Sequence, residues 1–243
     1  MTRQSSKIPI PTLDHEREIK NSGYRVIAGV DEAGRGSLFG PVCVGMVVLP
    51  LDDMDALALA LAEVRDSKLI AREKVYQLAA DVKATALAWA VGQGSAQQVD
   101  QYGIVAATRL AAEQALAAIL QDGLAPDYLL TDSRMPTPTG FPLENQRALV
   151  KGDRTCLSIA SAAILAKECH DRVVRELAQH YDDGYQLNNN VGYGTAAHRH
   201  ALQLLGPTPD HRYSFRPIAQ PRLLDVLDDR YGDSNSSVTP TGQ

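Results

Sequence analysis

Four acidic residues in this chain could together hold divalent metal ions. Asp31 and Glu32 directly follow a short apolar run, whereas Asp132 ends a second such run and Asp153 precedes a long amphipathic stretch. Each acid alone is more often a helix cap or a solvated residue, and Asp153 in particular could cap the amphipathic stretch. If all four converge, their mutual repulsion requires cations, and Mg²⁺ or Mn²⁺ suits carboxylate and phosphate oxygens.

A carboxylate cluster of this kind predicts hydrolysis of a phosphodiester bond. Two metal ions roughly 3.5–4 Å apart can clamp the attacking and the leaving oxygen of an in-line displacement. The sequence offers no Ser–His–Asp or Cys–His arrangement that competes with this interpretation. We therefore expect two-metal-ion catalysis.

A glycine-flanked arginine follows the first two acids at once. In Gly34-Arg35-Gly36 the glycines allow positive φ angles or a close backbone approach to a ligand, and Arg35 offers several donors to a phosphate. The pattern fits neither a P-loop nor a dinucleotide-binding turn. A tight hairpin connection with a surface arginine is the equally open alternative.

Two further segments could contact a substrate. Tyr193 stands between Gly192 and Gly194, so its ring could stack on a sugar or a base, or could pack on the core. Ser67 and Lys68 could bind a phosphate, although a helix cap followed by a solvated lysine is the more frequent arrangement. Both segments stay open on these residues alone.

Neither the histidines nor the cysteines predict a metal site. His198 and His200 lie two residues apart, which does not favour one face of a helix. Cys43, Cys156 and Cys169 include no Cys-x-x-Cys pair, so we expect reduced thiols rather than disulfides or structural zinc.

The segments that must position these residues alternate between strand-like and helix-like patterns. Short apolar runs between breakers predict strands, and longer amphipathic or Ala-rich runs predict helices. The first two strands should form a hairpin, and Thr195 should cap a helix. We expect strands over 24–30, 42–49, 84–91, 128–131 and 147–151. We expect helices over 13–20, 54–64, 72–83, 96–121 with a break near Tyr102-Gly103, 158–180, 196–205 and 221–229, and a loop over 187–193.

This order predicts an α/β fold. Three early strands, a helical stretch, two more strands and then helices indicate a mixed five-stranded sheet flanked by helices, with a C-terminal helical appendage. We expect an N-terminal extension over 1–22, a catalytic domain over 23–195, a helical part over 196–230 and a disordered tail over 231–243.

The bulk composition is compatible with a polyanionic substrate despite a net charge of −5. Phosphate binding depends on local Lys and Arg, and residues 146–175 hold six such cations against three acids. No apolar run approaches the roughly 20 residues needed to span a membrane. The polar start lacks the apolar centre of a secretory signal, so we expect a cytoplasmic protein without membrane contact.

Taken together, these motifs resemble ribonuclease HII, the type 2 ribonuclease H family. The resemblance runs from about Tyr24 to Pro217, most of the chain, and its first segment is highly specific. The matching segments are Ala28–Gly36, Gly40-Pro41-Val42, Asp66-Ser67-Lys68, Thr131-Asp132, Lys151-Gly152-Asp153, Ser158–Lys167, Gly192-Tyr193-Gly194-Thr195 and His211–Phe215.

The resemblance implies a ribonuclease H-like sheet and an endonuclease with Mg²⁺ or Mn²⁺ as its cofactor. Such enzymes hydrolyse the RNA strand of RNA–DNA hybrids and cut 5′ of single ribonucleotides in duplex DNA, leaving 5′-phosphate and 3′-hydroxyl ends. RNA–DNA hybrids and ribonucleotide-containing duplex DNA are therefore the expected partners of a monomer. The implied metal-binding and catalytic acids are Asp31, Glu32, Asp132 and Asp153.

The resemblance also implies how the substrate is read. Gly34, Arg35 and Gly36 take the place of the motif that recognises the 2′-hydroxyl at the junction between RNA and DNA. Tyr193 takes the place of the stacking tyrosine. The implied phosphate contacts are Ser67, Lys68, Ser158 and Lys167.

Some positions depart from the family pattern. Val191 and Tyr213 stand where Lys and Arg are common, and His170 replaces a more usual Arg, which affects duplex contacts rather than the reaction.

Two alternative functions are disfavoured. The sister family ribonuclease HIII usually lacks the arginine at Arg35 and carries an added N-terminal domain. A non-catalytic binding module on the same fold is disfavoured because all four acids are present.

Overall fold

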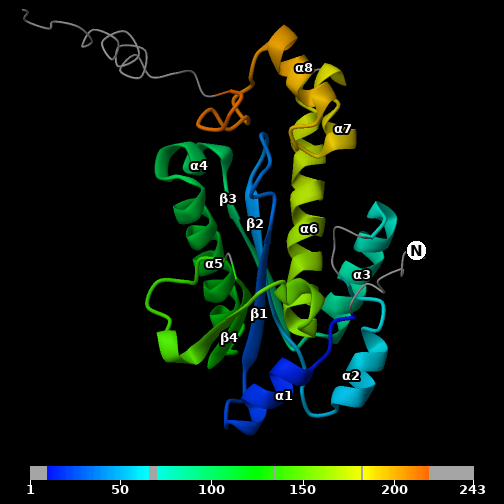
Figure 1. Cartoon of the computed structure of the whole chain (residues 1–243), viewed down its shortest axis with the longest axis vertical. Helices are drawn as coiled ribbons and strands as arrows, with labels where there is room; N and C mark the ends of the chain where they lie inside the picture. The colour runs from blue at the N-terminus through cyan, green and yellow to red at the C-terminus, as the bar shows by residue number, and fades with distance from the viewer. Residues whose placement is uncertain (1–9, 66–69, 134, 182, 219–243) are drawn as a thin grey trace, which may run out of the picture.

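The computed structural model describes residues 10–65, 70–133, 135–181 and 183–218. A five-stranded sheet with strand order β3-β2-β1-β4-β5 lies at its centre (Figure 1). Strands β1 to β3 pair antiparallel, whereas β4 and β5 run parallel to β1, which confirms the predicted mixed sheet. The strands are β1 (Ile27–Ala33), β2 (Val42–Val48), β3 (Ala88–Gly94), β4 (Tyr128–Asp132) and β5 (Gln146–Leu149).

Helices cover both faces of the sheet. Helix α6 (Leu157–Ala178) packs on β1 and β2, and α5 (Ile104–Gln121) packs on β2 and β3 from the other side (Figure 1). All seven residues of β2 are buried, as expected for a strand between two helical layers. Glycine allows α6 to approach closely, because a Cβ on Gly45 would lie 2.3 Å from the carbonyl oxygen of Ala162.

The remaining helices are short and mostly follow the predicted pattern. Gly103, with φ +81°, separates two helices at the predicted break, and Thr195 caps the next predicted helix by accepting a hydrogen bond from the His198 amide. The helices are α1 (Asp14–Asn21), α2 (Met54–Ala60), α3 (Arg72–Thr85), α4 (Ala96–Tyr102), α7 (Leu187–Asn190) and α8 (Ala196–Leu205). The 3₁₀ turns are η2 (Leu143–Asn145), η3 (Gly152–Arg154) and η4 (Asp183–Tyr185).

Several predicted boundaries were wrong. The third strand begins at Ala88 rather than residue 84, because α3 continues to Thr85. The fifth strand ends at Leu149, because Lys151 adopts a left-handed φ of 56°. Residues 187–190 of the predicted loop are helical. The helix predicted over 221–229 lies outside the described residues.

Helix α1 belongs to the core although it falls within the predicted N-terminal extension. Ile19 is buried, and Glu16 is fully buried at the start of α6. Its Oε1 atom accepts hydrogen bonds from the Ser158 amide at 2.8 Å and from the Cys156 thiol at 3.2 Å. Glu16 therefore satisfies one of the N–H groups that the start of a helix leaves without an intrahelical partner.

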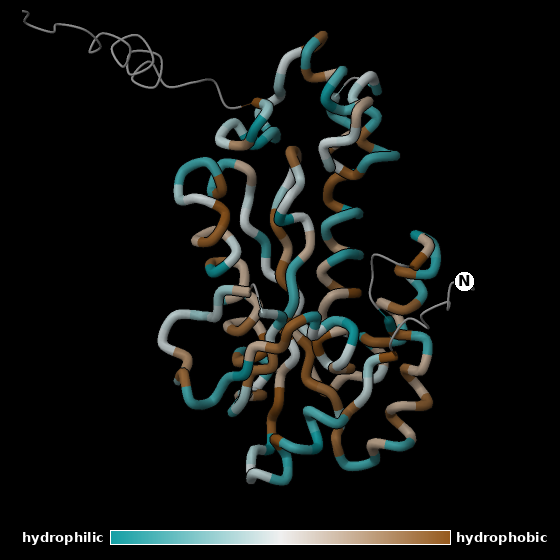
Figure 2. Tube along the Cα trace, in the orientation of Figure 1, coloured by the Kyte–Doolittle hydropathy of each residue, from teal (hydrophilic) through white to brown (hydrophobic). Residues whose placement is uncertain are grey.

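Apolar residues follow the central strands and alternate with hydrophilic ones along α6 (Figure 2). The three cysteines are buried and unpaired, as predicted. Within the described ranges, we find no helix with the length and apolar character needed to cross a membrane. The C-terminal helices α7 and α8 lie at the end of α6, beside the connection between β1 and β2 (Figure 1).

Candidate active site

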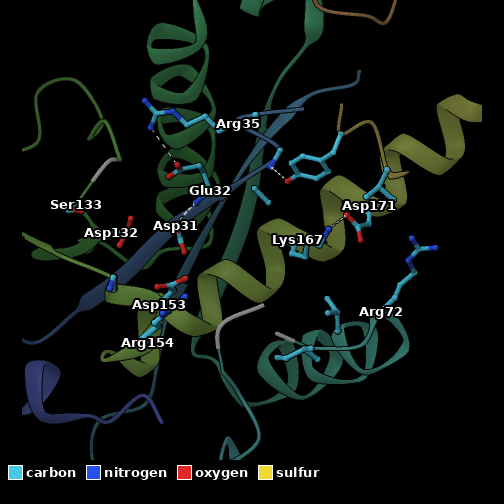
Figure 3. A pocket seen from close by; sticks show the side chains of 18 of the residues that line it. Asp31, Glu32, Arg35, Arg72, Asp132, Ser133, Asp153, Arg154, Lys167 and Asp171 are labelled. Atoms are coloured by element: carbon cyan, nitrogen blue, oxygen red, sulfur yellow. Dashed lines mark hydrogen bonds and ion pairs between the residues drawn. The ribbon is translucent and has the colours of Figure 1, made fainter. Parts of the chain in front are cut away.

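The four predicted acids line one pocket with a volume of about 770 Å³. Asp31 and Glu32 lie near the end of β1, and Asp132 ends β4. These strands are parallel, with Val30 opposite Thr131, so their carboxyl ends meet at the same edge of the sheet. The 3₁₀ turn η3 adds Asp153. Figure 3 shows Asp31, Asp132 and Asp153 pointing toward a common space.

The carboxyl group of Asp31 shows that negative charge accumulates here. Asp31 is 7% exposed. Burial raises its pKa well above the ordinary value, and the charges of Glu32, Asp132 and Asp153 raise the pKa further. A hydrogen bond of 2.8 Å from the Glu32 amide to Oδ1 of Asp31 acts in the opposite direction. The ionised form of Asp31 therefore needs a nearby positive charge.

Backbone geometry holds the other two acids in place. The amide of Gly152 donates a hydrogen bond of 2.9 Å to Oδ1 of Asp132, which joins β4 to the η3 turn. Gly152 also packs on α6, since a Cβ there would lie 2.6 Å from Cδ1 of Ile159. Asp153 does not cap α6, because Cys156 stands at that position and makes no side-chain cap bond. The turn instead directs Asp153 into the pocket.

The donor set fits a divalent cation that keeps part of its hydration shell. Among the described residues, no three His, Cys, Asp or Glu side chains come close enough to form a ready metal cage. Mg²⁺ commonly binds through one or two carboxylates, with waters and substrate phosphates completing its shell. Four carboxylates around an open pocket match this mode, and a bound cation would relieve the repulsion at Asp31.

The predicted glycine–arginine loop lines the same pocket. Gly34 has φ +77° and lies tightly against α6, since a Cβ on Gly34 would lie 2.3 Å from Nδ1 of His170. A non-glycine residue would be strained there. The guanidinium group of Arg35 lies 3.4 Å from Oε1 of Glu32 (Figure 3). The loop is therefore a close-packed part of the acidic centre rather than a free hairpin turn.

Tyr193 and the glycine–arginine loop form one unit. The Gly34 amide donates a hydrogen bond of 3.3 Å to the phenol oxygen of Tyr193. The backbones of Ser37 and Tyr193 form a β-bridge, and the Leu38 amide donates to the Gly192 carbonyl at 2.8 Å. Tyr193 is only partly buried and lines the pocket, so the core alternative does not describe it fully.

Of the four predicted phosphate contacts, the structure places Lys167 at the pocket but not Ser158. Lys167 lines the pocket, forms a 2.6 Å ion pair with Asp171 and lies 5.6 Å from the centroid of the Tyr193 ring. The structure does not bring Ser158 to the pocket. Its side chain is fully buried in the first turn of α6, with Oγ 3.3 Å from the Cys156 sulfur. Ser67 and Lys68 lie outside the described residues.

Sequence reasoning missed several residues of the pocket wall. Arg154 and Lys151 flank the Asp153 turn, and the basic character of residues 146–175 could have indicated them. Asp171 lies one helical turn after Lys167, a spacing that favours an ion pair. Arg72 donates to the carbonyls of Asn188 and Asn189 at 2.9 and 3.0 Å, and this link between α3 and α7 has no local signal.

Comparisons with known proteins show which family the chain resembles in sequence. A family model described as ribonuclease HII matches residues 28–218. A ribonuclease HII of Roseiflexus castenholzii is 45% identical over 209 residues, covering 86% of this chain and 89% of that protein. Ribonuclease HII of Thermus thermophilus is 43% identical over 198 residues, covering 82% of this chain and 90% of that protein.

A solved structure shares the fold at low sequence identity. The ribonuclease H2 of Pyrococcus horikoshii superposes with a TM-score of 0.63 at 21% identity, covering 86% of this chain and 100% of that one. The likeness to this structure shows a common fold. The sequence relationship shows that the chain belongs to the ribonuclease HII family and is a metal-dependent ribonuclease H.

Proposed function

We propose that this enzyme hydrolyses the RNA strand of RNA–DNA hybrids and also cuts 5′ of single ribonucleotides embedded in duplex DNA. The products would carry 5′-phosphate and 3′-hydroxyl ends. The observation that carries the proposal is the presence of the acids and of the Gly34-Arg35-Gly36 loop in the wall of one pocket. This arrangement supports the proposal, because a cutting centre and a group able to inspect the sugar would lie within reach of the same nucleotide.

The proposed metal ligands are Asp31, Glu32, Asp132 and Asp153. Two bound Mg²⁺ or Mn²⁺ ions would supply an activated water and stabilise the leaving 3′ oxygen. The protein's own contribution is to hold four carboxylates at strand ends and in a tight turn. Asp31 keeps its orientation through the Glu32 amide, and Asp132 keeps its orientation through the Gly152 amide.

The proposed reader of the ribose is the Gly34-Arg35-Gly36 loop. The 2′-hydroxyl distinguishes RNA from DNA and can both donate and accept hydrogen bonds. Backbone amides and carbonyls exposed by glycines can bind it in both ways. Tyr193 would then stack on the next sugar, where a missing 2′-hydroxyl allows closer contact.

The proposed phosphate contacts are cations in the pocket wall. Lys167, Lys151 and Arg154 line the pocket and can approach the backbone of a bound duplex. Ser67 and Lys68 remain proposed contacts from the family resemblance. Such contacts position the duplex without reading its sequence, so we propose that the enzyme acts on hybrids of any sequence. We also propose that it acts as a monomer.

The decisive experiment maps cleavage of matched duplexes. One strand is all DNA, contains one ribonucleotide, contains several ribonucleotides or is all RNA, and each duplex is incubated with Mg²⁺, Mn²⁺ or chelator. We expect cuts 5′ of the single ribonucleotide and within the RNA strand, with none in all-DNA duplex or with chelator. Cleavage restricted to long hybrids would refute the single-ribonucleotide activity, and unchanged cleavage with chelator would refute the metal centre.

A further inference from the structure

Arg212 and His211 are adjacent residues of the C-terminal segment. Hydrogen bonds connect them to the two proposed substrate-reading elements, the Gly34-Arg35-Gly36 loop and Tyr193. We propose that Arg212 and His211 are positioning residues that set the spacing between the Gly34-Arg35-Gly36 loop and Tyr193, and thereby the selectivity for a single ribonucleotide. This inference rests on the function proposed above. Neither side chain lines the pocket, and both are fully buried.

Arg212 binds both ends of the segment that begins at Arg35 in the Gly34-Arg35-Gly36 loop and ends at Gly40. Its Nε atom donates to the carbonyl of Gly40 and its Nη1 atom to the carbonyl of Arg35, each at 3.0 Å. The main chain adds two bonds in the same place, from the Arg212 amide to the Leu38 carbonyl and from the Gly40 amide to the Asp210 carbonyl. One planar guanidinium group thus fixes both ends of residues 35–40.

The buried guanidinium group is costly for folding. Burial lowers the pKa of Arg212 to about 10, and its Nη2 atom has no hydrogen-bond partner among the described residues. Taking a charged group out of water costs several kcal/mol unless attraction to other charges and hydrogen bonds compensate for it. The fork of donors is the contribution that an apolar side chain cannot make, and the loop it holds carries the proposed ribose reader.

His211 reaches the second reading element through His198. The Thr208 amide donates to Nδ1 of His211 at 2.9 Å, so the proton of the neutral ring lies on Nε2. Nε2 of His211 therefore donates to Nε2 of His198 at 3.0 Å. The proton of His198 then lies on Nδ1, which donates to the Tyr193 carbonyl at 3.0 Å.

In this series of hydrogen bonds, every donor has an acceptor when the imidazoles of His198 and His211 are both neutral. Burial lowers the pKa of His211 to about 4 and also lowers the pKa of His198. The chain of donors therefore runs in one direction, from the C-terminal segment to the backbone of Tyr193. Arg212 on one side and His211 on the other fix the two readers relative to each other.

A single ribonucleotide makes the strictest demand on this spacing. In an all-RNA strand every sugar carries a 2′-hydroxyl, so a displaced loop still finds one to bind. At an isolated ribonucleotide the loop must meet the only 2′-hydroxyl while Tyr193 meets the following deoxyribose. A shift between the two readers should therefore affect the single-ribonucleotide substrate more than the hybrid.

The test compares kcat and KM on these two substrates for Arg212→Met, Arg212→Lys and the wild type. Arg109→Met is the matched control, because it makes the same chemical change at an exposed position on α5. We expect kcat/KM on the single ribonucleotide to fall on the order of 10- to 100-fold relative to the hybrid in both Arg212 variants, the scale of loss from small misplacements. Arg109→Met should match the wild type.

Two outcomes would overturn the role of Arg212. Equal losses on both substrates would indicate a purely structural residue. Full activity of Arg212→Lys would show that charge, rather than the forked geometry, is sufficient. A wild-type enzyme that cuts hybrids but no single ribonucleotides would overturn the proposed selectivity itself and not the anchoring of the loop.

The anchoring is measured separately from cleavage by NMR. In ¹⁵N-labelled protein at neutral pH, we expect the Nδ1–H tautomer for His198 and the Nε2–H tautomer for His211. The amide resonances of Gly34 and Gly36 should shift in Arg212→Met and stay in place in Arg109→Met. The opposite tautomers would overturn the histidine chain, and unshifted glycine amides would overturn the anchoring by Arg212.

Discussion

The phenol oxygen of Tyr193 accepts a hydrogen bond from the backbone N–H of Gly34 at 3.3 Å. The two residues are 159 positions apart in the chain, yet they connect the proposed stacking platform directly to the proposed ribose reader. The roles of the hydroxyl and the ring of Tyr193 can therefore be separated by mutation, because the hydroxyl binds the loop and the ring is proposed to stack on the substrate.

Tyr193→Ala should reduce cleavage at a single ribonucleotide by the equivalent of roughly 1–3 kcal/mol, as for other aromatic stacking platforms. Tyr193→Phe keeps the ring and loses only the bond to Gly34, so its loss should be smaller. Single-turnover rates on a duplex with one ribonucleotide measure both effects. An unchanged rate in Tyr193→Ala would return this residue to a packing role.

Asp31→Asn should abolish cleavage and stabilise the metal-free protein. Because the folded state raises the pKa of Asp31, the ionised carboxylate destabilises the fold, and this cost grows as pH rises through the raised pKa. Asparagine avoids the charge and retains an oxygen for the Glu32 amide. Thermal unfolding at pH 8 in chelator should show a Tm higher by about 2–4 °C for each kcal/mol gained.

Metal provides the control for the Asp31→Asn measurement. Mg²⁺ should stabilise the wild type by binding only its folded state, so the difference in Tm should shrink when Mg²⁺ is added. A lower Tm for Asp31→Asn in chelator would contradict the picture of repelling carboxylates.

Acidification should destabilise the protein through His170. Burial lowers the pKa of His170 from 6.5 to about 4, so between these values the unfolded chain binds more protons than the folded one. The free energy of unfolding should therefore fall as pH drops from 6.5 toward 4, by at most about 3 kcal/mol from this residue. Urea unfolding measured across this range should show a shallower pH dependence for His170→Gln. The same pH dependence of the free energy of unfolding in the wild type and in His170→Gln would contradict the role assigned to His170.

Glu16→Ala should destabilise the fold without changing the chemistry. The variant removes the acceptor for the Ser158 amide at the start of α6, a loss of about 0.5–2 kcal/mol for a helix cap. Urea unfolding measures the change in stability, and kcat on a hybrid well below the unfolding temperature should match the wild type. Glu18→Ala is a suitable control, because Glu18 lies on the same helix as Glu16 but is exposed, where it pairs with Arg147 of β5. Equal stability of the Glu16→Ala variant and the wild type would show that the bond from the Ser158 amide to Glu16 does not stabilise the fold.

The sequence predicted those parts of the site that depend on local pattern. Asp31 and Asp132 stand at the ends of apolar runs, so the sequence alone allows a joint site, and the resemblance to ribonuclease HII makes it an expectation. The parallel pairing of β1 and β4 brings the two strand ends together. The left-handed φ of Lys151 has no signal in the sequence pattern, because non-glycine residues rarely adopt this conformation. The sequence alone leaves Asp153 open as a helix cap, because it precedes a long amphipathic stretch.

Residues whose partners are distant in sequence gave no usable signal. Ser158 matches a family motif, but its burial depends on Glu16 from a helix that precedes the motif by 142 positions. Arg212 and His170 contact loops through backbone carbonyls, which any residue type presents. The extent of the predicted domains stays a prediction, although the packing of α1 shows that part of the first 22 residues belongs to the core.

The bond between Arg212 and the Arg35 carbonyl spans 177 positions, and this has a consequence for biosynthesis. The Gly34-Arg35-Gly36 loop is synthesised first, and all four acids have been made by residue 153. Arg212, which anchors the loop, is added only after them. A nascent chain therefore acquires every group proposed to cut a phosphodiester before it acquires the contact proposed to make cutting selective.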